Sequence, residues 1–178
     1  MIINIKIDDE YYTYYEDIKY FIEHINIPKD KVIWCPFDKE NSNFVKCFRD
    51  YGYKVLHSHI ANGQNFYEYE PNEPWDIIIS NPPFKNKRYL IERVLSFNKK
   101  FALIFGIHCF NTNNFTKHLL KAKHLQIIIP IKRYSFFKNE NDKPSKPFFH
   151  SIWICNDLLS QDIIIFDNHK FKEIKNDK

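Results

Sequence analysis

The segment from residue 75 to residue 84 constrains the fold of this chain most strongly. Residues 76–80 read Asp-Ile-Ile-Ile-Ser, and Asn-Pro-Pro-Phe follows at 81–84. The first part is a short β-branched run, typical of a strand buried on both faces. The two prolines fix two φ angles and remove two backbone donors, so the strand cannot continue. We therefore expect Asn81 at the carboxyl end of a central strand, where open α/β sheets bind ligands.

Strand-like and helix-like segments alternate along the chain until about residue 131. Alternation of this kind predicts parallel βαβ units with right-handed crossovers. The last long strands then follow each other directly, which predicts an antiparallel hairpin at the sheet edge. The expected strands are 31–35, 53–60, a brief 66–69, 76–80, 101–107, 125–131, 148–155 and 161–166, and the expected helices lie near 18–25, 42–51, 89–95 and 115–120.

Length and composition indicate one globular domain, 1–178, with an N-terminal arm at 1–15 and a charged tail from about 168. The chain is 44% hydrophobic and 17% aromatic, which argues against disorder. It has only three glycines, which excludes glycine-rich phosphate loops. A net charge of +4 is compatible with a nucleic-acid partner.

The cysteines and histidines do not form a metal-binding pattern. No Cys-x-x-Cys pair occurs, and His57 and His59 share a strand face without an identifiable third ligand. We therefore expect no metal, and reduced thiols in a cytoplasmic protein. No apolar run approaches the roughly 18 residues of a membrane span, so no membrane association is expected.

Asn81-Pro82-Pro83-Phe84 resembles the (Asp/Asn/Ser)-Pro-Pro-(Tyr/Phe) motif of the amino-methyltransferases that use S-adenosylmethionine. The resemblance implies a Rossmann-like class I methyltransferase fold: a mostly parallel seven-stranded sheet with a terminal antiparallel hairpin. It also implies transfer of a methyl group to the exocyclic N6 amine of adenine in DNA or RNA. The side-chain oxygen of Asn81 and the carbonyl of Pro82 would accept the amine hydrogens, and Phe84 would stack on the base.

The likeness extends to the expected cofactor side. Residues 31–44 resemble the family's first motif, a strand followed by Pro-Phe and a tight turn, although the family's glycines are absent. Asp38 or Glu40 would meet the methionine amino group, and a positive φ at Asn41 would let the loop fold back. The resemblance assigns these residues to S-adenosylmethionine: Tyr12, Thr13, Cys35, Pro36, Phe37, Asp38, Asn41, Ser42, Ser58, His59, Asn65 and Phe66.

In detail the chain resembles small, phage-type adenine methyltransferases, which share Asp-Glu-Tyr-Tyr-Thr (9–13) and Ser-His-Ile (58–60). Two alternatives stay open. Related families methylate a protein glutamine amide with Asn-Pro-Pro-Tyr. The missing glycines, and the absence of an acidic residue after the second strand, also fit a non-catalytic binding module or a partner subunit. Residues 138–146 are the expected contact with the substrate.

Overall fold

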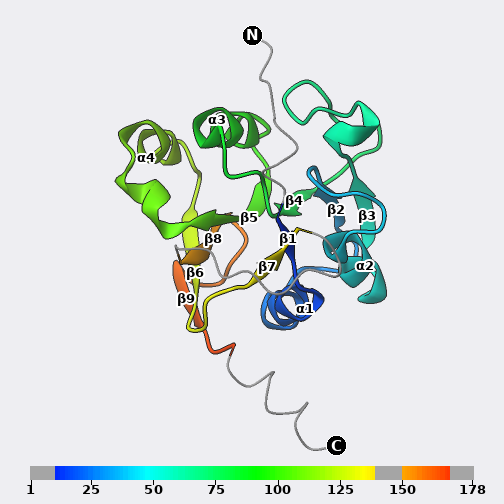
Figure 1. The fold of residues 1–178 in the computed structure, drawn as a ribbon, viewed down its shortest axis with the longest axis horizontal. Coiled ribbons are helices and arrows are strands. Elements are labelled where there is room, and N and C mark those ends of the chain that lie inside the picture. The colour runs from blue at the N-terminus through cyan, green and yellow to red at the C-terminus, as the bar shows by residue number, and fades with distance from the viewer. Residues whose placement is uncertain (1–10, 139–149, 169–178) are drawn as a thin grey trace, which may run out of the picture.

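A seven-stranded sheet forms the centre of the computed structural model, which describes residues 11–138 and 150–168 (Figure 1). The strand order is β3-β2-β4-β5-β8-β6-β9. Its strands are β2 (Val32–Cys35), β3 (Lys54–His57), β4 (Ile77–Ser80), β5 (Lys100–Gly106), β6 (Leu125–Pro130), β8 (Ser151–Asn156) and β9 (Ile163–Phe166). A separate antiparallel pair joins β1 (Tyr12–Thr13) to β7 (Phe136–Phe137).

Helices cover both faces of the sheet. They are α1 (Tyr15–His24), α2 (Asn43–Asp50), α3 (Lys87–Ser96) and α4 (Asn113–Leu119), with short 3₁₀ turns η2 (Ile60–Asn62) and η3 (Ile107–Asn111). Figure 1 shows α1 and α2 on one side and α3 and α4 on the other. Two hydrophobic cores result, one under each helix pair, and Trp153 and Trp34 are the largest fully buried side chains in them.

The strand directions confirm the expected fold class. β3, β2, β4 and β5 run parallel to one another, whereas β8 is antiparallel to both β5 and β6. The expected antiparallel pair is therefore present as β6–β8, but it does not lie at the edge of the sheet as expected. β9 then pairs parallel with β6 and forms the edge of the sheet outside that pair.

Two local expectations are wrong. Residues 66–69 form a turn instead of a strand, because Asn65 Oδ1 accepts from Tyr67 N at 3.2 Å and the Asn65 carbonyl accepts from Tyr69 N at 2.7 Å. Such local bonds compete with strand pairing. Leu120, expected on an apolar helix face, lies just beyond the end of α4 and is 84% exposed.

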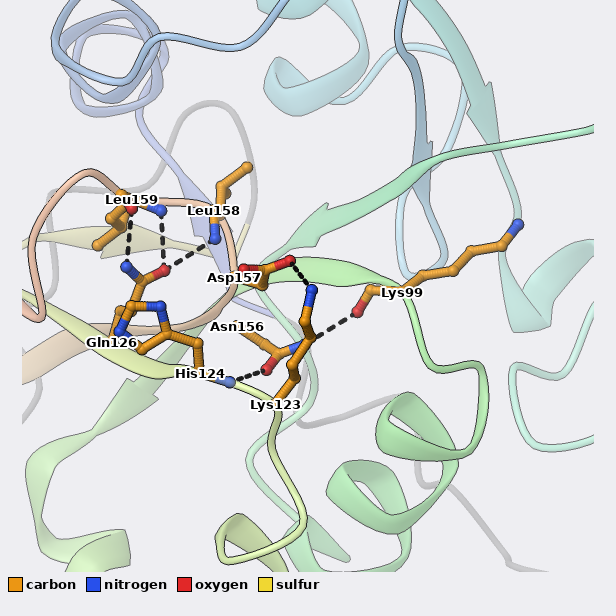
Figure 2. Close-up of polar contacts among 8 residues, drawn as sticks. All are labelled: Lys99, Lys123, His124, Gln126, Asn156, Asp157, Leu158 and Leu159. Carbon is orange, nitrogen blue, oxygen red and sulfur yellow. Dashed lines mark hydrogen bonds and ion pairs between the residues drawn. The ribbon is translucent and has the colours of Figure 1, made fainter.

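Gln126 on β6 holds the loop that leads from β8 to β9 (Figure 2). Its Oε1 accepts from the amides of Leu158 and Leu159, each at 2.8 Å. Its Nε2 donates to the carbonyls of Leu159 and Gln161, at 2.8 and 3.2 Å. Gln126 is fully buried, so these four bonds satisfy its amide completely. This side chain fixes the loop from which β9 starts.

Several expectations fall partly or wholly outside the described residues, namely the N-terminal arm, the segment from 139 to 146 and the tail beyond 168. Across 11–138 and 150–168, no helix combines the length and the hydropathy needed to cross a membrane. The same residues contain no cluster of three or more His, Cys, Asp or Glu that could hold a metal ion.

Candidate functional site

A pocket lies where β2, β3 and β4 end. β1 and the start of α2 complete its wall, and its empty space, including the open mouth, is about 670 Å³. Ten residues expected at the site line it: Tyr12, Thr13, Pro36, Phe37, Asp38, Ser42, His59, Phe66, Asn81 and Pro82. The structure therefore brings the two expected halves of the site, around Asp38 and Asn81, into one cavity.

Asn81 is held with its side-chain oxygen as the available acceptor. Its Nδ2 donates a hydrogen bond to the Tyr11 carbonyl at 2.9 Å, which fixes the orientation of the amide. Its Oδ1 is buried and has no hydrogen-bond partner among the described residues. A buried acceptor without a partner costs free energy. The Asn81 amide therefore has one fixed donor and one unsatisfied acceptor at the end of β4.

The Asp38 carboxylate is the acidic group of the pocket. Asp38 is only 5% exposed, and its Oδ2 accepts from Ser80 Oγ at 2.5 Å. Its backbone N–H donates to the Ser58 carbonyl at 3.1 Å, which ties the loop after β2 to the end of β3. Thr13 Oγ1, in the same pocket, is a second buried oxygen without a partner in the described ranges.

The loop from Pro36 to Ser42 keeps its shape without glycine. Ser42 caps α2, with Oγ accepting from Val45 N at 3.3 Å. Glu40 points to the outside, where it bonds Arg49 Nη1 at 2.5 Å and also bonds His57. The hydrogen bond from Arg49 is the main reason that the pKa of Glu40 falls below its ordinary value. Asp38, not Glu40, is therefore the carboxylate that faces the pocket.

Five expected site residues do not line the pocket, namely Cys35, Asn41, Ser58, Asn65 and Phe84. Cys35 and Ser58 are buried framework: Ser58 Oγ accepts from Trp34 Nε1 at 3.0 Å, and burial raises the pKa of the Cys35 thiol well above its ordinary value. Asn41 is exposed and does not adopt the positive φ expected for it. Asn65 directs its oxygen into its own turn.

Phe84 lies beside the pocket and not in its wall. Its ring centroid is 6.1 Å from that of Tyr11 and 6.2 Å from that of Phe136, which lies on β7. The β1–β7 pair therefore supplies the aromatic surroundings of this ring. Phe84 and Tyr11 form an aromatic rim next to Asn81.

Sequence reasoning missed part of the pocket wall. Tyr11, Asn43, Phe44, Ile60 and Pro83 also line it. Asn43 Nδ2 donates to the Thr13 carbonyl at 3.0 Å and so joins α2 to β1. Asn43 directly follows the cap Ser42, and this position was the only signal in the sequence that could have identified it.

No protein-family model matches this sequence, and no curated protein matches it. Solved structures do match. One is a protein from Vibrio vulnificus assigned as the modification subunit of a type I restriction enzyme, at 10% identity and a TM-score of 0.54, covering 94% of this chain and 52% of that one. This chain thus spans about half the length of that subunit.

A second match is a Listeria monocytogenes protein assigned as a class I S-adenosylmethionine-dependent methyltransferase. It has 14% identity and a TM-score of 0.53, and the match covers 91% of this chain and 67% of that one. With the observed strand order, these likenesses establish the Rossmann-like fold of class I methyltransferases.

Proposed function

We propose that this chain is an S-adenosylmethionine-dependent methyltransferase that modifies the exocyclic N6 amine of adenine in DNA or RNA. The observation that carries the proposal is the buried Oδ1 of Asn81, which has no partner in the described ranges while its Nδ2 is fixed by Tyr11. The structural neighbours support the proposal at the level of the fold, and one of them is assigned as the modification subunit of a type I restriction enzyme.

The chemistry of the amine explains why an acceptor is needed. The lone pair of an exocyclic amine is delocalised into the ring, which makes the nitrogen a poor nucleophile. Asn81 Oδ1 and the Pro82 carbonyl would accept its two hydrogens, draw the nitrogen toward a tetrahedral geometry and localise the lone pair. The rigid proline pair keeps these acceptors in place, and such positioning is a main source of catalysis in a direct transfer.

The residues of the pocket fit an S-adenosylmethionine cofactor. Asp38 offers a carboxylate for the ammonium of the methionine part, and Thr13 Oγ1 offers a further polar partner. Phe37, Ile60 and Phe66 supply apolar lining for the adenine part. When bound, S-adenosylmethionine supplies an electrophilic methyl group on its sulfonium.

The rim formed by Phe84 and Tyr11 is the proposed stacking surface for the target base. Stacking on an aromatic side chain is worth about 1–3 kcal/mol per base. A base in a duplex has to be flipped out at a cost of a few kcal/mol, so stacking offsets a large part of that cost. A single-stranded target avoids most of it.

Isothermal titration calorimetry with S-adenosylmethionine is the first test, and we expect saturable one-site binding. Tritiated methyl transfer into separate DNA, tRNA and protein pools then identifies the acceptor. Label in DNA or tRNA supports the proposal. Label in protein alone would indicate the glutamine reaction, and no cofactor binding at millimolar concentration would indicate a non-catalytic module or partner subunit.

A further inference from the structure

The charges of this chain are distributed unevenly along the sequence. Between Ile77 and Lys138 there are twelve lysines and arginines and one acidic residue, Glu92. Between residues 11 and 76 there are seven basic and eleven acidic residues. The proline motif lies near the start of the basic part. The side of the pocket formed by Asn81 and Pro82 therefore belongs to the positively charged half. Such asymmetry is typical of proteins that bind polyanions.

Two cation–imidazole pairs have their cation in this basic half. Lys87 Nζ is 2.9 Å from His108 Nε2, and Arg133 Nη2 is 2.8 Å from His150 Nε2. Lysine and arginine only donate, so the imidazole nitrogen accepts in each pair. Partial desolvation and the charge of Lys87 hold the pKa of His108 below its ordinary value. In each pair a cationic side chain thus donates to an imidazole nitrogen.

Both pairs lie on the side of the sheet where β2, β3 and β4 end, which is also the side of the pocket. His108 follows β5, and His150 directly precedes β8, which is antiparallel to β5. The Ile107 N–H donates to the His150 carbonyl at 2.8 Å, so the backbones that carry the two imidazoles are hydrogen-bonded neighbours. Lys87 begins α3, directly after the loop that follows β4 and contains Asn81. The two pairs therefore follow one another along the strand ends, starting next to the part of the pocket that contains Asn81.

We propose that Lys87–His108 and Arg133–His150 are two phosphate-binding sites for the backbone of the nucleic-acid strand that carries the target base. A phosphate beside either pair gains a charge-assisted hydrogen bond, and the Arg133 guanidinium suits phosphate oxygens particularly well. Phe84, one of the two rings of the aromatic rim, is three residues before Lys87 in the sequence. A stacking surface near a basic track favours a nucleic acid over an acidic peptide, because single strands are held in this way.

That the bound nucleic-acid strand is also the substrate rests on the proposed function, whereas the binding of its phosphates by these two pairs does not. The test therefore uses fluorescence anisotropy of a labelled mixed-sequence single-stranded oligonucleotide, without cofactor, over a series of sodium chloride concentrations. Lys87→Gln and Arg133→Gln each remove one charge. Lys121→Gln removes a charge from an exposed lysine beyond α4 and is the matched control.

We expect Lys87→Gln and Arg133→Gln each to bind the oligonucleotide several-fold more weakly than the wild type at low salt. The loss should be the same for every oligonucleotide sequence. The slope of log affinity against log salt should fall by about 0.7 for each lost contact to a single strand. Lys87→Arg and Arg133→Lys should keep most of the affinity, since they keep the charge. Lys121→Gln should match the wild type.

Equal affinities and slopes for Lys87→Gln, Arg133→Gln and Lys121→Gln would overturn the inference, as would equally tight binding of poly-glutamate. A failure of oligonucleotide binding with intact cofactor binding contradicts only this inference. A failure of cofactor binding with intact oligonucleotide binding contradicts only the proposed function.

Discussion

Ser80 and Asp38 join the two halves of the pocket. Ser80 Oγ, at the end of β4, donates to Asp38 Oδ2 at 2.5 Å, and Asp38 lies in the loop after β2. Ser80 directly precedes Asn81, so one strand end fixes the carboxylate proposed for the cofactor and presents the amide proposed for the substrate. A hydrogen bond to a charged group is worth about 1.5–3 kcal/mol, so this contact is a strong constraint on the position of Asp38.

Ser80→Ala should weaken S-adenosylmethionine binding about tenfold, which corresponds to about 1.4 kcal/mol. The Asp38 carboxylate loses the donor that orients it, and calorimetry measures the change. Ser151→Ala is the matched control, because Ser151 is also a buried serine but its Oγ has no partner in the described ranges. Equal affinities for the two variants would show that the Ser80 contact does not orient the cofactor site.

Gln126→Ala should lower the free energy of unfolding by about 2–4 kcal/mol, because the backbone groups of the loop after β8 lose their partners. Urea denaturation measures this loss. Hydrogen exchange should locate it at the amides of Leu158 and Leu159. Gln161→Ala is the control, since its side chain is exposed and only its carbonyl takes part in these bonds. A Gln126→Ala protein as stable as Gln161→Ala would contradict the assigned role.

Stability should fall in the alkaline range because of the buried thiols. Burial raises the pKa of Cys109 to about 11 and that of Cys47 to about 12, while an unfolded cysteine has a pKa of about 8.5. Above that value the unfolded chain binds fewer protons than the folded chain, so each rise in pH favours unfolding.

Urea midpoints should therefore be constant from pH 7 to about 8.5 and then decrease up to the folded pKa of about 11 for Cys109. Cys109→Ala should show a shallower decrease. A thiol reagent at pH 8 should react with native protein slowly and with unfolded protein at four cysteines. Fast reaction of the native protein would contradict the buried positions.

The strongest part of the sequence prediction was local and periodic. The β-branched run before the proline motif became β4, and the helix expected near 42–51 became α2 (Asn43–Asp50). These features depend on neighbouring residues, so a single sequence contains them. The fold class followed from the same alternation of elements.

Contacts between segments that are distant in the sequence could not be predicted from such local patterns. The β1–β7 pair joins Tyr12 to Phe137, and Asn81 finds its partner in the carbonyl of Tyr11. Two-residue strands have no periodicity, and a backbone carbonyl carries no sequence signal. Glu40 and Asp38 are two residues apart, and only the fold decides that Asp38 faces the pocket while Glu40 pairs with Arg49.

The most direct test of the central claim is methyl transfer by Asn81→Ala, with S-adenosylmethionine affinity measured on the same preparation. Nucleic acid treated with wild-type protein is digested to nucleosides, and N6-methyladenine is quantified by mass spectrometry. We expect the variant to transfer about 100-fold less, as for the loss of other transition-state hydrogen bonds, at nearly the wild-type cofactor affinity. Asn114→Ala, an exposed asparagine on α4, should behave as wild type. Wild-type transfer by Asn81→Ala would contradict the account.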